Sequence, residues 1–271
     1  MENKTTKKAV KGTRKTMLRV AKKDKNGIVS LSYGLSGKMH NILALSTDCV
    51  SCSRCVHRNQ TTGKGLSIKA VIKAVKRGAV IAICVLCYAF KYLKVRPNVR
   101  AVYRANGEQL KRELSYFELG TIANEIVQAL RKNHTTLFRI EAFGDLTSTT
   151  QALNYLRICA LVYSLKRNKK IKIALWTKNY DFLLKAWNQL TDTEKVNNRK
   201  ILSVVLSSVF IGIPLNEHIR EKVQNALGMP VKVFTVKAEN TGINCGKRSC
   251  ASCQKCYDAY NGITDIWEFI K

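Results

Sequence analysis

Negatively charged side chains are scarce in this chain, and long apolar segments are absent. The sequence has 18 Asp and Glu against 47 Lys and Arg in 271 residues, so its formal net charge at pH 7 is +29. An excess of this size is greater than solubility alone requires. It favours a polyanionic partner, nucleic acid first and an anionic membrane second. The alternative is a merely solvated surface in a protein from a basic proteome.

The longest apolar runs, residues 79–90 and 201–214, are shorter than the roughly 20 residues of a membrane-spanning helix. We therefore interpret both as buried core. The polar, lysine-rich N-terminus also has neither the apolar segment nor the small-residue cleavage site of a secretory signal. These absences predict a cytoplasmic protein without a membrane partner. In that compartment closely spaced cysteines favour metal binding over disulfides.

Cysteine is the residue type whose placement is most informative, since nine of the ten cysteines lie in two runs. The C-terminal run has the spacing Cys-x4-Cys-x2-Cys-x2-Cys and consists of Cys245, Cys250, Cys253 and Cys256. Thiolates two residues apart can hold one ion or cluster from a single loop. This run alone is sufficient for a four-thiolate zinc site or a [4Fe–4S] cluster. The tenth cysteine, Cys159, is predicted to be a buried structural thiol.

The N-terminal run offers five candidate ligands, one more than a cubane cluster needs: Cys49, Cys52, Cys55, Cys84 and Cys87. One of them is spare, or His57 competes as a ligand. The first three alone would leave one iron open, and adding Cys87 would close the site. Tight triplets are typical of ferredoxins, whereas structural zinc sites usually pair two Cys-x2-Cys arms across a gap. The spacing therefore favours one or two [4Fe–4S] clusters, with zinc as the alternative.

The apolar pattern between the two runs predicts strands that alternate with helices. Strands are expected at residues 28–33, 41–46, 136–142, 171–176, 201–209 and 231–236, with a further β-rich segment at 79–86. Helices are expected within 64–77 and at 117–132, 149–165 (with Ser148 as N-cap), 181–190 and 216–227. Such alternation indicates a parallel sheet. We expect an α/β domain over residues 27–240, built as a partial (β/α) barrel or an open parallel sheet, with a basic arm at 1–26 and a cysteine segment at 241–271.

Ligands of parallel sheets and barrels bind where the strands end, and polar residues follow the predicted strands here. We expect the cysteine-ligated loops at these carboxyl ends as well. Candidate catalytic residues are Glu141, Asp145 and Lys178, and candidate cofactor-binding residues are Gly144, Thr177 and Asn179. The alternatives are that Asp145 caps a turn, Glu141 pairs with a cation and Lys178 is a surface lysine. The sequence has no Walker loop, Rossmann glycine pattern, nucleophile elbow or paired His motif.

Two basic segments are candidates for contact with nucleic acid. Residues 1–26 form a polar arm that gains affinity for phosphates by counterion release, or is simply a solvated tail. Residues 91–112 mix cations with Tyr92 and Tyr103. These rings can stack on bases between phosphate-binding cations, or they pack inward while the cations are solvated.

Several short motifs together resemble the phage-encoded family called gene product 88. They are Cys84–Cys87 with Tyr88-Ala89, the segment 98–106, residues 139–146 (Arg-Ile-Glu-Ala-Phe-Gly-Asp-Leu), residues 174–179 (Ala-Leu-Trp-Thr-Lys-Asn) and the terminal run 245–257. The resemblance covers most of the chain after Asn41 but not the basic arm. It implies a phage or mobile-element origin, a bacterial host and a cysteine-ligated site, and it implies no activity.

The layout is also similar, more distantly, to radical S-adenosylmethionine enzymes. Residues 43–55 resemble their three-cysteine loop after the first strand, 141–145 their Gly-rich motif, and 245–256 an auxiliary cluster. The usual spacing is Cys-x3-Cys-x2-Cys, whereas the spacing here is Cys-x2-Cys-x2-Cys. This resemblance implies a partial TIM barrel and S-adenosylmethionine as a cofactor.

Three functions are therefore expected as alternatives. The first is an iron–sulfur protein of a phage or mobile element that contacts nucleic acid. The second is a radical S-adenosylmethionine-like enzyme that modifies nucleic acid or protein. The third is a zinc-stabilised module that docks on a host or phage protein.

Overall fold

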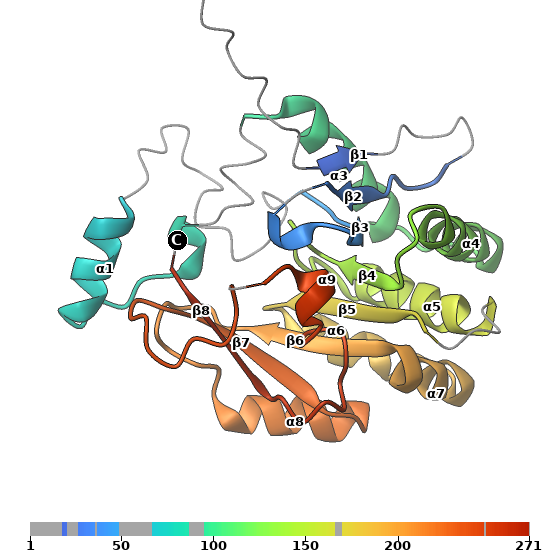
Figure 1. Cartoon of the computed structure of the whole chain (residues 1–271). Helices are drawn as coiled ribbons and strands as arrows, with labels where there is room; N and C mark the ends of the chain where they lie inside the picture. The colour runs from blue at the N-terminus through green and yellow to red at the C-terminus, as the bar shows by residue number, and fades with distance from the viewer. Residues whose placement is uncertain are drawn as a thin grey trace, which may run out of the picture.

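The computed structural model describes residues 27–35, 37–48, 67–86, 95–165, 170–246 and 248–270, together with the backbone of 18–20. Eight strands form one sheet in the order of the chain, from β1 to β8 (Figure 1). Their bounds are β1 Leu18–Val20, β2 Ser32–Gly34, β3 Leu43–Leu45, β4 Leu137–Ile140, β5 Lys172–Thr177, β6 Leu202–Ser207, β7 Val231–Lys237 and β8 Asp265–Phe269.

The first three strands pair antiparallel, and β3 to β8 are all parallel to one another. In the register, Leu45 lies beside Ile140, and Ile140 beside Leu175. The carboxyl ends of β3, β4 and β5 therefore meet at one edge. Among the described strands, β1 and β8 are not paired with each other, so the sheet is open. The predicted parallel α/β sheet is confirmed, without closure into a barrel.

The helices follow the strands along the chain. They are α1 Ile68–Lys76, α3 Pro97–Lys111, α4 Tyr116–Lys132, α5 Thr149–Leu165, α6 Tyr180–Trp187, α7 Asp192–Ile201, α8 Glu217–Leu227 and α9 Cys250–Cys253, with short 3-10 turns η1 Gly37–Met39 and η3 Ile83–Leu86. No helix in the described part of the chain is both long and apolar enough to cross a bilayer.

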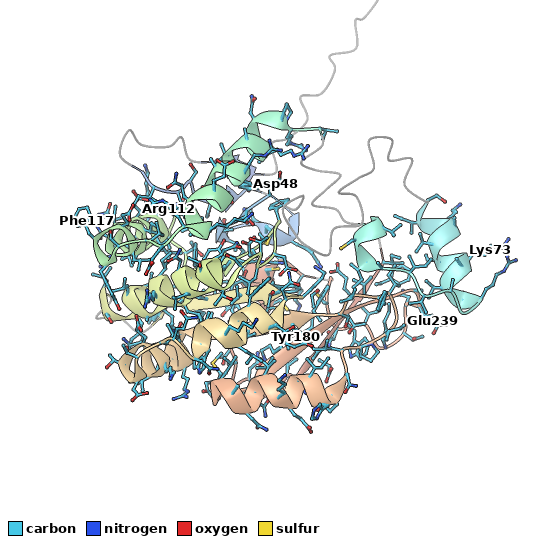
Figure 2. The ribbon with its side chains drawn as sticks, turned by 180° about the vertical axis from the view of Figure 1, so that it is seen from behind. Asp48, Lys73, Arg112, Phe117, Tyr180 and Glu239 are labelled. Atoms are coloured by element: carbon cyan, nitrogen blue, oxygen red, sulfur yellow. The ribbon has the colours of Figure 1, made fainter. Side chains whose placement is uncertain are left out.

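Helices α3 to α8 cover one face of the sheet, since alternate strand residues pack against them in a single core. Leu45, Phe138 and Ile173 belong to this core together with apolar residues of α3 to α8. Residues i and i+2 of a strand share a face, so the residues between them point to the opposite side. Figure 2 shows the helices in front of the strands. Sequential parallel strands with their helices on one face are the arrangement of a (β/α) unit.

The opposite face of the sheet, here called the open face, is covered by the C-terminal segment. Leu137, Ala174 and Tyr257 form one buried cluster there, with Cys250 and Cys256 packed against it. Val205, Phe234 and Ile266 form a second cluster, with Cys245 and Cys256 at its border. In Figure 1, α9 lies in front of the strands on this side. Because β8 then pairs with β7, the last residues extend the sheet.

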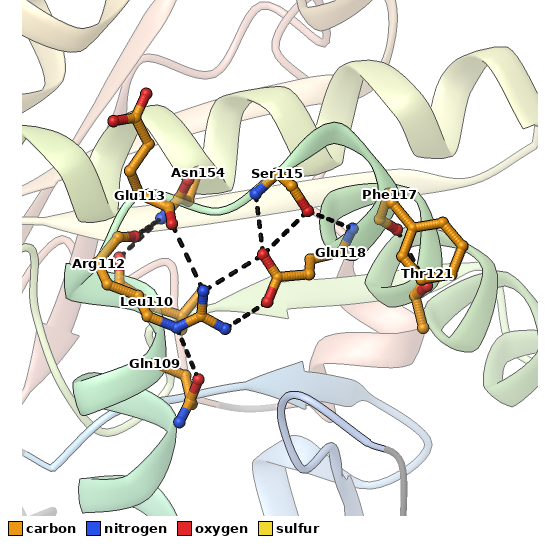
Figure 3. Close-up of polar contacts among 9 residues, drawn as sticks. All are labelled: Gln109, Leu110, Arg112, Glu113, Ser115, Phe117, Glu118, Thr121 and Asn154. Carbon is orange, nitrogen blue, oxygen red and sulfur yellow. Dashed lines mark hydrogen bonds and ion pairs between the residues drawn. The ribbon is translucent and has the colours of Figure 1, made fainter.

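A short polar joint fixes the turn between α3 and α4 (Figure 3). The Ser115 hydroxyl accepts from the Glu118 amide, and the Glu118 carboxylate accepts from the Ser115 amide, which is a capping box. Two guanidinium nitrogens of Arg112 donate hydrogen bonds to the same carboxylate, at 2.5 and 3.2 Å. These hydrogen bonds lower the pKa of Glu118 to about 2.

Most predicted elements are confirmed, with ends shifted by a few residues, and Ser148 accepts from the Gln151 amide at 3.1 Å as expected of an N-cap. The β-rich prediction for residues 79–86 is wrong, because residues 83–86 form η3. Sequence reasoning missed α3, α7 and β8. The predicted arm lies outside the described residues, except for β1.

Candidate functional site

Three consecutive polar residues, Ser46, Thr47 and Asp48, follow β3 at the carboxyl edge of the sheet, and all three are buried. Ser46 is held from two sides. Its carbonyl accepts from the Asn106 side chain of α3 at 3.0 Å, and its hydroxyl accepts from the Ala142 amide at 3.1 Å. Buried polar groups need such partners, so the chain leaving β3 is fixed between α3 and the end of β4.

Glu141 follows β4 directly and is the centre of a buried network. Its carboxylate accepts from the Thr47 amide and hydroxyl, from Gln151 at 2.9 Å and from the Tyr155 hydroxyl at 2.6 Å. Burial raises the pKa of Glu141 to about 7, although these hydrogen bonds oppose the shift. Burial also raises the pKa of Tyr155 well above its usual value. The alternative that Glu141 pairs with a cation is not seen among the described residues.

The backbone at this point is under constraint. Glu141 has a φ of 57°, a left-handed conformation that is uncommon for residues with a side chain. Gly144 follows in close contact with Thr47. A Cβ at Gly144 would lie 2.2 Å from the Thr47 hydroxyl and 2.3 Å from the Glu141 carboxylate. Only glycine fits this packing without displacement of the network.

Asp145 connects β4 to the end of β5. One carboxylate oxygen accepts from the Thr177 hydroxyl at 2.6 Å, and both accept from the Lys178 amide at 3.2 Å. The Lys178 ammonium lies 3.7 Å from the same carboxylate and is partly exposed. Asn179 donates to the Leu146 carbonyl at 2.6 Å. The structure thus brings together all six candidate residues after β4 and β5.

Asp48 is paired with two arginines of α3. Its Oδ2 atom lies 3.1 Å from Nε of Arg100 and 3.9 Å from a terminal nitrogen of Arg104. Sequence reasoning missed Asp48 and Thr47, although a polar triplet directly after an apolar strand is a signal for a strand-end site. It also missed Tyr155 and Gln151, which no sequence pattern marks.

This edge is a connected set of carboxylates, hydroxyls and amides. Glu141 accepts from Thr47 and from Gln151 and Tyr155 of α5, so it positions Thr47 and α5. A carboxyl with a pKa near 7 is also suited to exchange protons at neutral pH. The catalytic roles of Glu141, Asp145 and Lys178, and the cofactor contacts of Gly144, Thr177 and Asn179, stay predictions.

The C-terminal cysteines lie elsewhere. Cys250 and Cys256 pack on the open face against Leu137 at the start of β4 and Ala174 in β5. The backbone of Cys245 instead forms an isolated parallel β-bridge with that of Glu268 in β8. The prediction that this loop lies at the carboxyl strand ends is therefore wrong for Cys250 and Cys256. The physical reason is that an apolar face without helices has to be covered, and the segment after β7 covers it.

Three of these thiols are electrostatically coupled. Burial raises the pKa values of Cys245 and Cys250, and it raises the pKa of Cys256 to about 12. The charge of at least one neighbouring cysteine of the loop also raises each of these three pKa values. Without a bound cation the thiols are protonated at neutral pH.

Cations surround the cysteine loop on the open face. The Lys38 ammonium of η1 lies 3.6 Å from the sulfur of Cys245 and pairs with Glu268. Burial alone would lower the pKa of Lys38, but Glu268 and Cys245 raise it. Arg139 stacks on the Trp176 ring at 4.1 Å and lowers the pKa values of Cys250 and Cys256. Sequence reasoning missed both cations, although a charge within the apolar strand β4 is a detectable signal.

Lys232 of β7 is another cation on this face and is almost completely buried. Its ammonium donates to the Asn261 side chain at 2.7 Å and to the Ile263 carbonyl at 2.5 Å. Burial lowers the pKa of Lys232, whereas the neighbouring Cys256 and Asp258 raise it. Lys232 therefore ties the turn after the cysteine loop to the sheet.

No three His, Cys, Asp or Glu side chains are placed as the ligands of one metal ion, in the part of the chain that the structure describes. Cys49, Cys52, Cys55, Cys87, His57 and Tyr92 lie outside that part. Cys84, in η3, is buried, and Cys159 is buried within α5 as predicted.

Tyr103 is completely buried and its ring lies 5.5 Å from that of Phe143, so the inward-packing interpretation is correct for it.

Comparison with known proteins gives one result. A family model described as Gene product 88 matches residues 2–204. The match includes the basic arm, which we expected it to leave out, and ends before β7 and the second cysteine run. No curated protein and no solved structure matches the chain, and nothing relates it to radical S-adenosylmethionine enzymes. Because the matched range covers most of the 271 residues, the chain belongs to the Gene product 88 family of phage proteins.

Proposed function

We propose that this phage protein binds an iron–sulfur cluster through Cys245, Cys250, Cys253 and Cys256. The observation that carries the proposal is the placement of one four-cysteine loop on the open face beside Lys38 and Arg139. Four thiols within twelve residues are sufficient ligands for a [4Fe–4S] cluster. The loop is only partly buried, so a metal has access to it.

The arrangement of the thiols among the described residues is consistent with this proposal, because metal sites commonly form as the metal binds. Binding requires the thiols to lose their protons, which burial opposes here. A bound cation reverses that preference, since coordination deprotonates a thiol outright. The short helix α9 carries Cys250 and Cys253, so a rearrangement on metal binding would involve this helix.

The surrounding cations are suited to the charge of such a site. Four thiolates around a zinc ion or a typical cubane carry net negative charge, which a buried position disfavours. Lys38 and Arg139 supply positive charge from η1 and β4. Hydrogen bonds to the ligand sulfurs and nearby charge also tune the reduction potential of a cluster. The Lys38 contact with Cys245 is such a hydrogen bond.

Anaerobic purification followed by metal analysis and absorption spectroscopy tests this proposal. We expect iron and sulfide with broad absorption near ~400 nm. The double variant Cys250→Ser/Cys253→Ser should lose this absorption, while the matched control Cys159→Ala, a cysteine buried in α5, should keep it. Stoichiometric zinc without visible absorption would contradict the iron proposal and favour a zinc-stabilised interaction module, whose partner would be a host or phage protein.

A second candidate function is a radical S-adenosylmethionine-like enzyme. The observation in its favour is the series of six sequential parallel strands, β3 to β8, with helices on one face. The fold is only an analogy for function. Cys49, Cys52 and Cys55 follow the first of these strands in sequence and would be the ligands of an open cluster. Incubation of the reduced protein with S-adenosylmethionine should then yield 5′-deoxyadenosine, and its absence would contradict this candidate.

We also propose that the basic surface contacts nucleic acid. The support is the net charge of +29 together with the exposed lysines and arginines of α1 and α3. Affinity for an oligonucleotide should fall steeply as salt is raised, because phosphate contacts release counterions. A flat salt response would contradict this part of the proposal and leave the cluster proposal untouched.

A further inference from the structure

We propose that Arg100 and Arg104 of α3 bind the phosphodiester backbone of a nucleic acid at the carboxyl edge of the sheet. This inference rests on the proposed contact with nucleic acid and assigns that contact to a surface. It is independent of the cysteine loop, which lies on the open face.

The geometry of α3 places both guanidinium groups at the edge of the molecule. One side of α3 faces the interior of the protein, where Tyr103, Asn106 and Leu110 are buried. Arg100 and Arg104 are one turn apart and thus neighbours on the helix surface. Their side chains are 34% and 57% exposed, so both are reachable from solvent.

A single buried carboxylate holds the two arginines. Asp48 is 1% exposed and lies beside α3 (Figure 2), 3.1 Å from Arg100 and 3.9 Å from Arg104. Two guanidinium groups with one carboxylate leave one net positive charge. Among the described residues Arg104 makes no hydrogen bond, so its donors are available to a ligand. The planar guanidinium suits a phosphate, which it can bind through two parallel hydrogen bonds.

The site lies where parallel sheets bind their ligands. Asp48 follows β3, and Gly144 packs directly on Thr47, so the arginines border the segment that carries Asp145. Lys178, at the end of β5, adds a partly exposed cation to the same edge. The acidic groups that follow the strands there, Asp48, Glu141 and Asp145, are all buried. The exposed carboxylate nearest to them along α3 is Glu108, one turn beyond Arg104. A phosphate that approaches the strand ends therefore meets Arg100, Arg104 and Lys178 before the three buried carboxylates.

The test is a salt titration of oligonucleotide binding by the full chain, followed by fluorescence anisotropy. Arg104→Gln should weaken binding by about threefold or more and lower the salt slope by about 1. The matched control is Lys185→Gln on α6, which removes one exposed charge from the helix-covered face and should behave as the wild type. Arg104→Lys should keep the slope but bind less tightly, because lysine cannot bind in the bidentate mode.

Each other outcome overturns the inference. Equal effects of Arg104→Gln and Lys185→Gln would mean that binding is diffuse, and nucleic-acid contact would survive without this site. Arg104-dependent binding of inorganic pyrophosphate without oligonucleotide binding would mean a site for a small phosphate compound. A wild-type protein that binds no oligonucleotide at all would overturn the nucleic-acid proposal as well.

Discussion

The residue with the most unusual surroundings is Glu141, a carboxyl that is buried without a cation and held by Thr47, Gln151 and Tyr155. Its pKa is about 7 in the folded protein and near 4.5 in the unfolded chain. The folded state therefore binds the proton more tightly between these values. The stabilisation that Glu141 contributes is fully present below its pKa in the unfolded chain. It is lost as the pH rises through its pKa in the folded protein.

Glu141→Gln should remove this loss. The free energy of unfolding of the wild type should fall relative to that of the variant as the pH rises. Between pH 5 and pH 8 the difference between the two proteins should change by about 2–3 kcal/mol in favour of the variant. Chemical denaturation at a series of pH values measures the difference, in which the other titrating groups cancel. Parallel pH profiles for the two proteins would show that Glu141 does not titrate as described.

Gly144 offers a second prediction at the scale of one residue. Gly144→Ala should destabilise the protein by about 2–3 kcal/mol, because the new Cβ would overlap the Thr47 hydroxyl and the Glu141 carboxylate. Gly120→Ala in α4 is the matched control, since nothing lies within 4 Å of its Cβ position. That change should stabilise by about 0.5–1 kcal/mol through helix propensity. Thermal unfolding of both variants gives the comparison, and equal melting temperatures would refute the proposed packing.

At the scale of elements, the joint between α3 and α4 depends on one cap. Ser115→Ala should cost about 1 kcal/mol, since it removes the acceptor of the Glu118 amide. Thr121→Ala, one turn further along α4 in Figure 3, is the control and should change stability by only a few tenths of a kcal/mol. Urea denaturation distinguishes the two. A Ser115→Ala variant as stable as the wild type would mean that Arg112 and the backbone amide of residue 115 are enough to hold Glu118.

The elements that could be predicted from sequence are those with a clear apolar period. Helix α4 has this period in Leu119, Ile122, Ile126 and Leu130, and strands β4 to β7 are short apolar runs, because each is buried against the same core. Helix α7 was missed because only Val196 and Ile201 are apolar in it, and its Thr191–Glu194 capping box went unnoticed. Segment 79–86 was mistaken for a strand because its apolar residues pack beneath α1 instead of in the sheet.

The candidate site was predictable to a similar extent. The order of the parallel strands in the sequence was enough to predict that Glu141, Asp145 and Thr177 lie at one edge of the sheet. The partners of the buried carboxylates at this edge, such as Tyr155 for Glu141 and Arg100 for Asp48, come from helices whose rotation about their axes a sequence does not give. The place of the second cysteine loop was also not predictable, since it depends on which face the helices leave uncovered.

At the scale of the whole molecule, the two faces of the sheet are stabilised differently. Helices cover one face, and the segment with the cysteine loop covers the other. If metal organises that loop, its removal should loosen the open face alone. Treatment with a chelator should speed amide hydrogen exchange in residues 245–257 and leave α4 and α5 unchanged. Unchanged exchange in the loop would mean that metal has no part in holding it.

The central claim is that Cys245, Cys250, Cys253 and Cys256 bind a metal centre together. X-ray absorption at the metal edge of the anaerobically purified protein tests it most directly. The account predicts an iron edge with sulfur neighbours at about 2.3 Å, and loss of that signal in the Cys250→Ser/Cys253→Ser variant but not in Cys159→Ala. A spectrum of oxygen or nitrogen neighbours only, or one that the double variant leaves unchanged, would contradict the claim.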